Sequence, residues 1–358
     1  YASLGATVIQ DRRELRFFAR KIPNPICQEF VEGTEYTCDV YIDFDRRVRC
    51  VVPRRRIEVR AGEVSKSCVV KNPQIMDQAR RMVELLGAFA ERIKFSAVLL
   101  FAVLWFTFSY IPMAHMVWGG GFLMKIGSVD FAGGNVVHIT SGVSALVLAL
   151  LLGKRKNYGK ISYNPHNVPF VFLGASLLWF GWFGFNGGSA GAANALAVHA
   201  CMTTNTSAAA AMLSWMLLER AKNGRPTLVG ASTGMVIGLV AITPGSGFVP
   251  IWAAIIIGAL ASPISYFFIT VVKKKFGYDD ALDVFGCHGV GGIWGGIATG
   301  LFTQTSINPS AKWNGLLFGS TELFLRQLAA VGVAAAFAGV DAATADSRQR
   351  PGSAGSAS

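Results

Sequence analysis

The stretch Asp130-Phe131-Ala132-Gly133-Gly134-Asn135-Val136-Val137-His138-Ile139-Thr140 decides the interpretation of this chain. It opens an uncharged apolar run that continues to Leu152 and is long enough to cross a bilayer. A histidine inside such a segment is energetically costly, so the first hypothesis is a functional role with a partner elsewhere in the chain. The segment from Asp283 to Gly292 offers that partner, because it repeats the order aspartate, glycine, histidine at the head of a later apolar segment and carries His288.

Charge divides the chain into two unlike parts. Residues 1–88 hold 28 of the 54 charged residues, whereas residues 89–358 are mostly apolar. We therefore predict a soluble part followed by a membrane part. The net charge of +12 does not indicate nucleic-acid binding, because the basic residues of the second part form short clusters between apolar spans. Tyr1 is not a natural start and no signal-peptide layout follows it, so we expect a fragment.

The six cysteines show neither a CxxC pair nor zinc-ligand spacing, so we expect free thiols, no metal site and no cofactor.

Residues 1–88 predict a small α+β fragment. Apolar and polar residues alternate at strand period in residues 26–30, 36–43 and 48–53, and residues 72–86 have helical spacing. The runs Gln28–Asp39 and Val52–Glu63 resemble one stretch of the ATP-grasp fold of carboxylate-amine ligases. That family's glycine-rich loop, nucleotide lysines and metal ligands have no counterpart here, so phosphoryl transfer lacks the metal ions on which it relies. We therefore expect no enzymatic activity.

From residue 94 onward the sequence predicts transmembrane helices, each needing about 20 apolar residues. Eight candidate spans follow one another: 95–118, 131–153, 168–188, 192–218, 227–248, 250–272, 283–304 and 323–340. Twelve basic residues fall in alternate connections, whereas the other connections hold three. The positive-inside rule then places both termini in the cytoplasm of a multi-pass cell-membrane protein.

Several long motifs in order identify a family. They are Ala90–Ser96, Ser109–Gly120, Asp130–His138, Trp182–Ala190 and Asp283–Gly292. Over about residues 89–340 the chain closely resembles the ammonium transporter (Amt/Mep/Rh) family. That resemblance implies an eleven-helix fold of two inverted repeats, a homotrimer with one pore per subunit, and ammonium as substrate. We therefore expect an all-α polytopic membrane protein with about eight of the eleven helices, the first three being replaced by residues 1–88 and a flexible tail occupying residues 341–358.

The predicted site residues are His138, His288 and Trp118, with Asp130 in support. Both histidines lie a turn or two into their helices, which enter from opposite sides, so both could approach the midplane. The resemblance implies that the pair lines the pore. Trp118 could hold arriving ammonium by a cation–π contact, although an interfacial tryptophan is the common alternative. Asp130 precedes a helix from the outer side, so N-capping or a helix-dipole contact is expected, and the resemblance implies that this aspartate is essential near the entrance.

Several residues receive other interpretations. Asp283 is expected to cap the helix of His288. The aromatic residues of 170–185 are expected to serve packing, and His115, His166 and His199 remain unassigned.

A neutral histidine pair suits ammonium for an energetic reason. An unpaired cation in a low dielectric costs many kcal/mol, whereas removing its proton at neutral pH costs about 1.4 kcal/mol per pKa unit. Imidazole can then offer ammonia a hydrogen-bond donor or acceptor and can take up or pass on a proton, so net transport of ammonia and net transport of ammonium through separate proton transfer are both compatible with the sequence. Two alternatives stay open: a membrane-tethered ATP-grasp ligase fragment, and a non-conducting remnant that keeps the residues without a sealed pore.

Overall fold

The computed structural model describes residues 36–42, 48–60, 63–69, 95–155, 158–159, 165 and 167–347. The chain divides into two compact units, residues 1–96 and 97–358, and each is described by itself.

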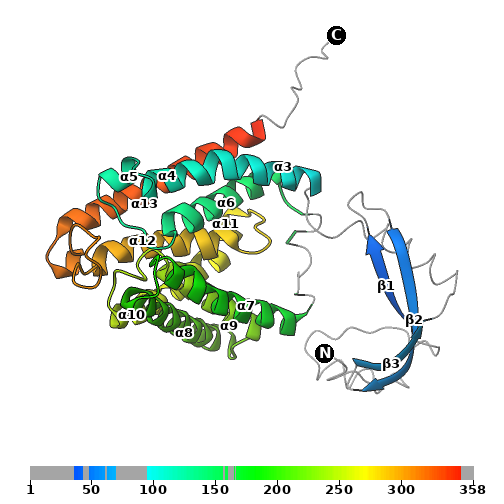
Figure 1. Ribbon diagram of the computed structural model, residues 1–358. Helices are drawn as coiled ribbons and strands as arrows, with labels where there is room; N and C mark the ends of the chain where they lie inside the picture. Colours follow the sequence, from blue (N-terminus) through cyan, green and yellow to red (C-terminus); the bar gives the residue numbers. More distant parts are fainter. Residues whose placement is uncertain are drawn as a thin grey trace, which may run out of the picture. The chain divides into compact units, whose positions relative to one another are not determined.

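The first unit contains a three-stranded antiparallel sheet in the order β1-β2-β3 (Figure 1). Its strands are β1 (Tyr36–Ile42), β2 (Val48–Arg60) and β3 (Glu63–Val69). The two strands predicted at 36–43 and 48–53 are present, but the second continues through Pro53, which lies opposite Cys38, to Arg60. The third strand was not predicted. The expected strand at 26–30 and the expected helix at 72–86 lie outside the described residues.

The second unit is helical, and every predicted span coincides with a helix to within several residues. The helical segments are α3 (Phe95–Trp105), η1 (Phe106–Tyr110), α4 (Ile111–Trp118), α5 (Phe122–Lys125), η2 (Gly134–Ile139), α6 (Thr140–Leu152), α7 (Val168–Trp182), η3 (Phe183–Gly187), α8 (Ala195–Asn223), α9 (Leu228–Ile242), α10 (Ile251–Phe267), η4 (Phe268–Val272), α11 (Lys273–Phe276), η5 (Phe285–Gly289), α12 (Val290–Phe302), η6 (Leu316–Phe318) and α13 (Thr321–Ser347). The segments η1 to η5 are π-helical turns that continue into the neighbouring α-helices, and η6 is a short 3-10 turn. Because α13 runs to Ser347, the first seven residues of the expected tail are helical.

Length and apolar composition make this unit a membrane domain. Within the described residues, five helical segments are long and apolar enough to cross a membrane: Leu99–Lys125, Gly134–Leu152, Val168–Gly187, Ile251–Phe276 and Thr321–Ala343. The helix Leu228–Ile242 is a shorter apolar one. The all-α polytopic fold class predicted from the sequence is therefore confirmed for this unit.

Polar side chains begin three of the helices. Asn167, Asn194 and Thr227 accept hydrogen bonds from the backbone N–H groups of Phe170, Ala197 and Gly230, at the starts of α7, α8 and α9. Each side chain satisfies one of the N–H groups that a helix start leaves without an intrahelical partner. These residues therefore define where the three helices start.

Small residues bring the helices close together. α8 packs between α9 and α10, and a Cβ atom placed on Gly258 of α10 would meet the backbone of Ser207 on α8. Gly238 of α9 lies against the same turn of α8. Because lipid gives apolar helices no reason to prefer one another, such close backbone approach is what holds them. α12 packs against α13 on one side and against α9 and α10 on the other, which places it in the interior of the bundle (Figure 1).

Candidate functional site

Two histidines from distant parts of the chain meet inside the helical unit. Nδ1 of His138, on η2, lies 3.2 Å from Nδ1 of His288, on η5, and the ring centroids are 5.3 Å apart. One Nδ1 atom must donate and the other must accept, so the contact requires at least one neutral ring. His138 is 2% exposed, and its Nε2 atom has no hydrogen-bond partner among the described residues. The structure thus brings the two predicted histidines together.

Two aromatic rings flank His138. The Trp182 ring stacks on it with centroids 5.3 Å apart and planes at 19°, and the Phe185 ring lies 6.1 Å away. The indole N–H of Trp182 donates to Thr243 Oγ1 at 2.9 Å, which fixes the ring. Both residues belong to the aromatic group that we interpreted as packing, and Trp182 does pack against Leu239 and Val240. The sequence did not show that the same rings also border the histidine pair.

Asp130 caps the helix that carries His138, as predicted. Its carboxylate accepts hydrogen bonds from the backbone N–H groups of Gly133, Gly134 and Asn135 at 2.7 to 2.8 Å, and from Val136 at 3.4 Å. The side chain is buried. A buried carboxylate is stable only where donors surround it, and four orphan N–H groups at a helix start supply them. The cap therefore fixes the first turn leading to His138.

Trp118 is joined to the same loop. Its indole N–H donates to the backbone carbonyl of Asp130 at 2.8 Å, and the side chain remains 42% exposed. Asp130 is thus linked through its carboxylate to the helix of His138 and through its carbonyl to Trp118. Trp118, Asp130 and the helix of His138 are therefore connected by hydrogen bonds, and Trp118 is the exposed member of this group.

The cap of the His288 helix is Asp280, and our assignment of this role to Asp283 was wrong. Asp280 accepts from the backbone N–H of Phe285 at 2.8 Å. Asp283 instead has a positive φ of 55°, and its carboxylate forms an ion pair with Lys273 at 2.7 Å. The sequence held a signal for Asp280, because it precedes His288 by eight residues, as Asp130 precedes His138.

Backbone contacts between the two histidine segments repeat with the same offset of 150 residues. A Cβ atom on Gly142 would meet the backbone of Gly289, and one on Gly292 would lie 3.2 Å from the backbone nitrogen of Ile139. Gly292 lies 150 residues after Gly142, and Gly289 lies 150 residues after Ile139, so the two contacts are equivalent in the two segments. The two segments thus cross at paired glycine positions, and this crossing sets the distance between the histidines.

An ion pair holds the loop that precedes Asp280. The guanidinium of Arg155 donates to both carboxylate oxygens of Asp279 at 2.8 to 3.1 Å, and the backbone N–H of Arg155 adds a bond of 2.8 Å. The Asp279 side chain is fully buried, whereas that of Arg155 is 25% exposed.

Two tyrosines lie in the same loop region, where the Tyr158 hydroxyl donates to the Tyr278 carbonyl at 2.9 Å. Burial, together with Asp280 and Asp283, raises the pKa of Tyr278 to about 12, so its phenol stays neutral at physiological pH.

Replacing Arg155 with methionine is expected to lower the stability of the folded protein by about 3 kcal/mol, because it removes the charged partner of a buried carboxylate. Thermal unfolding of the purified protein in detergent measures the change. Arg326→Met is the matched control, since Arg326 pairs with the exposed Glu322 on its own helix and should lose about 1 kcal/mol at most. Equal shifts for the two variants would contradict a special role for the Arg155 pair.

The other described histidines lie apart from this pair. His115 is exposed on α4. Nε2 of His199, on α8, donates to the Val249 carbonyl at 2.8 Å. His166 lies outside the described residues. In the part of the chain that the structure describes, no group of three His, Cys, Asp or Glu side chains could hold a metal ion.

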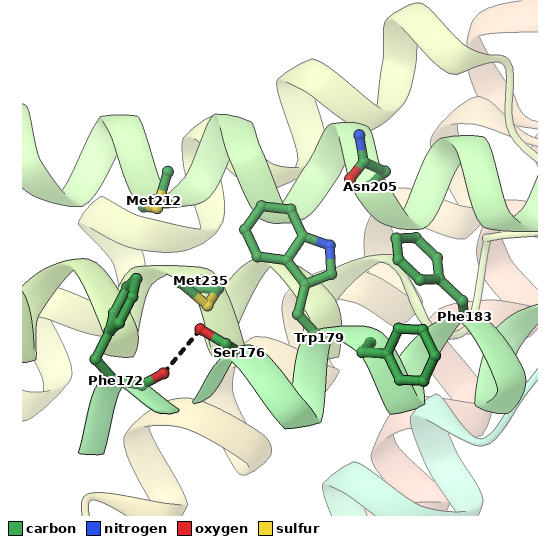
Figure 2. Close-up of a pocket in the computed structure, with 8 residues that line it drawn as sticks. Phe172, Ser176, Trp179, Phe183, Asn205, Met212 and Met235 are labelled. Atoms are coloured by element: carbon green, nitrogen blue, oxygen red, sulfur yellow. Dashed lines mark hydrogen bonds between the residues drawn. The ribbon is translucent and has the colours of Figure 1, made fainter. Parts of the chain in front are cut away.

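An apolar cavity of about 380 Å³ lies among α7, η3, α8 and α9 (Figure 2). It is lined by Phe172, Ser176, Trp179, Phe180, Phe183, Asn205, Met212 and Met235. The Ser176 hydroxyl donates to the Phe172 carbonyl at 2.9 Å, as Figure 2 shows. None of the lining side chains titrates near neutral pH, so the cavity has no group for proton transfer. The candidate site is therefore the histidine pair.

Comparison with known proteins agrees with these features. Residues 79–345 match the profile of the Ammonium Transporter Family. The chain is 54% identical over 245 residues to the ammonium transporter of Bacillus subtilis (strain 168), covering 68% of this chain and 60% of the relative. It is 52% identical over 245 residues to a putative ammonium transporter of Methanothermobacter thermautotrophicus, with the same coverage.

Solved structures give the same result. The crystal structure of Saccharomyces cerevisiae Mep2 matches 78% of this chain and 66% of its own, with a TM-score of 0.67 and 37% identity. Candida albicans Mep2 matches with a TM-score of 0.69 and 36% identity, over 78% of this chain and 63% of its own. The chain spans about 60% of the length of the first two sequence relatives. A family profile that matches most of the chain, together with identities above 50%, establishes that the chain is a multi-pass membrane protein of the ammonium transporter family.

Proposed function

We propose that this chain forms a conduction path for ammonium in which the ion gives up its proton and ammonia passes between His138 and His288. The observation that carries the proposal is the 3.2 Å contact between the two Nδ1 atoms within the membrane-spanning unit. Among the described residues, these rings hydrogen bond to each other and to no carboxylate. A site in which no carboxylate bonds to the rings disfavours a cation and favours a neutral molecule that can exchange hydrogen bonds with imidazole.

Trp118 and Asp130 act before the histidines on this path. Trp118 is half exposed, and its indole face can attract ammonium by a cation–π interaction without the cost of a buried anion. The backbone carbonyl of Asp130 accepts a hydrogen bond from Trp118, and the Asp130 carboxylate caps the helix of His138. Trp182 and Phe185 form an aromatic wall beside His138, which limits the water that accompanies the substrate.

The membrane arrangement is also a proposal. The twelve basic residues in alternate connections place both termini in the cytoplasm of a cell-membrane protein by the positive-inside rule. We further propose a homotrimer with one path in each subunit, on the ground of the family resemblance. The division into residues 1–88, 89–340 and 341–358 remains our prediction, and the family match begins at residue 79.

Replacing His138 with alanine tests the function. The variant should take up methylammonium at least tenfold more slowly than the parent chain in a strain without its own ammonium transporters, a loss that corresponds to about 1.4 kcal/mol of barrier. His199→Ala is the matched control, because His199 is partly buried and its side chain bonds, among the described residues, to the Val249 carbonyl, away from the histidine pair. Undiminished uptake by His138→Ala would overturn the proposal.

A parent chain that takes up no methylammonium would favour the alternative of a non-conducting remnant. That alternative remains because the match covers 60% of the length of the relative. The remaining alternative, an ATP-grasp ligase fragment, rests on the resemblance of residues 1–88. The family match leaves residues 1–78 uncovered. Tight binding of Mg-ATP by the full chain would support that alternative.

A further inference from the structure

A buried glutamine on α13 binds the backbone just before the Asp130 cap. Gln327 is 0% exposed. Its Oε1 atom accepts from the Val129 N–H at 2.8 Å, and its Nε2 atom donates to the Val129 carbonyl at 2.8 Å. The side-chain amide thus pairs with both polar groups of one residue, 198 positions away in sequence. Two such bonds hold a peptide more rigidly than one, because they fix its orientation as well as its place.

The residue that Gln327 holds is directly joined to the site. Val129 precedes Asp130, whose carboxylate caps the His138 helix and whose carbonyl accepts from Trp118. A shift of Val129 would therefore move both groups of Asp130 together. Among the described residues, the Gln327 side chain hydrogen bonds to Val129 and Gly296 and to neither histidine nor Trp118, so its effect on Asp130 and Trp118 passes through this loop.

Gln327 also lies where α13 crosses α12, the helix that continues from His288. A Cβ atom on Gly300 of α12 would lie 3.1 Å from the Gln327 Cβ atom, and the Gln327 Nε2 atom is 3.5 Å from the Gly296 carbonyl. Because glycine occupies both positions, the glutamine stem packs closely against α12. The loop that carries Asp130 is thereby tied to the helix of the opposite histidine.

The loop before the second cap is held in a corresponding place. Asp279 lies 150 residues after Val129 and directly before Asp280, and Arg155 binds it through several hydrogen bonds. Each half of the site thus has a long polar side chain fixed to the residue that precedes its capping aspartate. The recurrence indicates that fixing this residue matters at both ends of the histidine pair.

We propose that Gln327 is a positioning residue of the conduction path: it fixes Val129, and through Asp130 it sets the places of Trp118 and of the first turn that carries His138. This inference rests on the proposed function, because it assigns Gln327 a task within the same path.

Hydrogen exchange tests the positioning without requiring transport. The probe is Gln327→Met, which keeps the length of the side chain and removes the two hydrogen bonds to Val129 together with the longer one to the Gly296 carbonyl. In the purified full chain, the amides of residues 133–136, which Asp130 binds, should exchange at least about fivefold faster in the variant. Ser262→Ala is the matched control, because Ser262 is 0% exposed and bonds α10 to Ala211 of α8, away from the loop. Unchanged exchange of these amides in Gln327→Met would overturn the inference.

A double-mutant cycle connects the loop to the substrate. In liposomes containing the full chain, Gln327→Met should raise the KM for methylammonium about fivefold, whereas Ser262→Ala should leave it unchanged. In a Trp118→Leu background, Gln327→Met should alter the KM less than about twofold, because the tryptophan that Gln327→Met would displace is already absent. Equal effects in the two backgrounds would show that Gln327 serves stability alone and would overturn the inference.

The two assays separate the two proposals. A parent chain that transports nothing, combined with faster exchange in Gln327→Met, would refute the function and retain the positioning of the loop. Normal transport by the parent, combined with unchanged exchange and an unchanged KM in the variant, would refute the role of Gln327 alone.

Discussion

Replacing Gly142 with valine is expected to abolish methylammonium uptake, with a loss of more than about 100-fold. A Cβ atom at this position would overlap the backbone nitrogen and Cα atom of Gly289 and would lie 2.9 Å from the His288 carbonyl carbon. Overpacking against movable side chains costs about 1–3 kcal/mol, but a backbone cannot change rotamer. The two helices must separate, and the 3.2 Å contact of the histidines breaks. Uptake in the transporter-deficient strain measures the loss.

The control for this change is Gly174→Val. Gly174 is also within a helix, and nothing lies within 4 Å of a Cβ atom placed there. That variant should transport like the parent chain and appear in the membrane in the same amount. Gly142→Ala should already lower uptake, because the Cβ atom alone causes the overlap. Full activity of Gly142→Val would show that the helix crossing does not set the spacing of the histidines.

Replacing Asp130 with alanine is expected to reduce uptake by more than about 100-fold and to lower stability by about 3–5 kcal/mol. The carboxylate accepts from four backbone N–H groups in a buried site, and alanine leaves all four without that partner. The first turn leading to His138 then loses its anchor, and the loop that positions Trp118 loses its shape. Uptake and thermal unfolding in detergent give the two quantities.

Asn194→Ala serves as the comparison for Asp130. Asn194 caps α8 through one bond to Ala197 in an exposed position, so its loss should cost about 1 kcal/mol and leave uptake unchanged. Asp130→Asn should fall between the two, because an amide accepts through one oxygen and turns its N–H₂ group toward further donors. Asp130→Ala with normal uptake would contradict the linked role of the cap.

The sequence predicted the helices and the histidine pair for physical reasons. Apolar runs of bilayer length have few alternatives to a helix, because lipid offers no partner for backbone N–H and C=O groups. His138 and His288 were conspicuous because an ionisable residue in such a run demands a partner. The cap at Asp130 followed from its place directly before a helix, and the structure places its carboxylate as expected.

Other features depended on tertiary contacts that spacing alone does not give. Asp280 and Asp283 both precede His288. The eight-residue spacing shared with Asp130 and His138 favours Asp280, but the bond from the Phe285 N–H to Asp280 and the pairing of Asp283 with Lys273 are what establish the cap. The stacking of Trp182 on His138 was hidden among many aromatic residues whose common role is packing. Gln327 carried no signal, because a single amide in a helix has no distinctive pattern until its partner 198 residues away is known.

Both histidines lie in π-helical turns, His138 within Gly134–Ile139 and His288 within Phe285–Gly289. A π turn accommodates one residue more than the α-helix would, so it fixes the rotational register of everything that follows it. Losing one residue within either turn would close it to the narrower α form, so the imidazole that the turn carries would change its direction while the helix after it kept its register. Insertions and deletions at these two places would therefore change the chemistry of the path rather than its length, and evolution is expected to tolerate them far less here than in the loops.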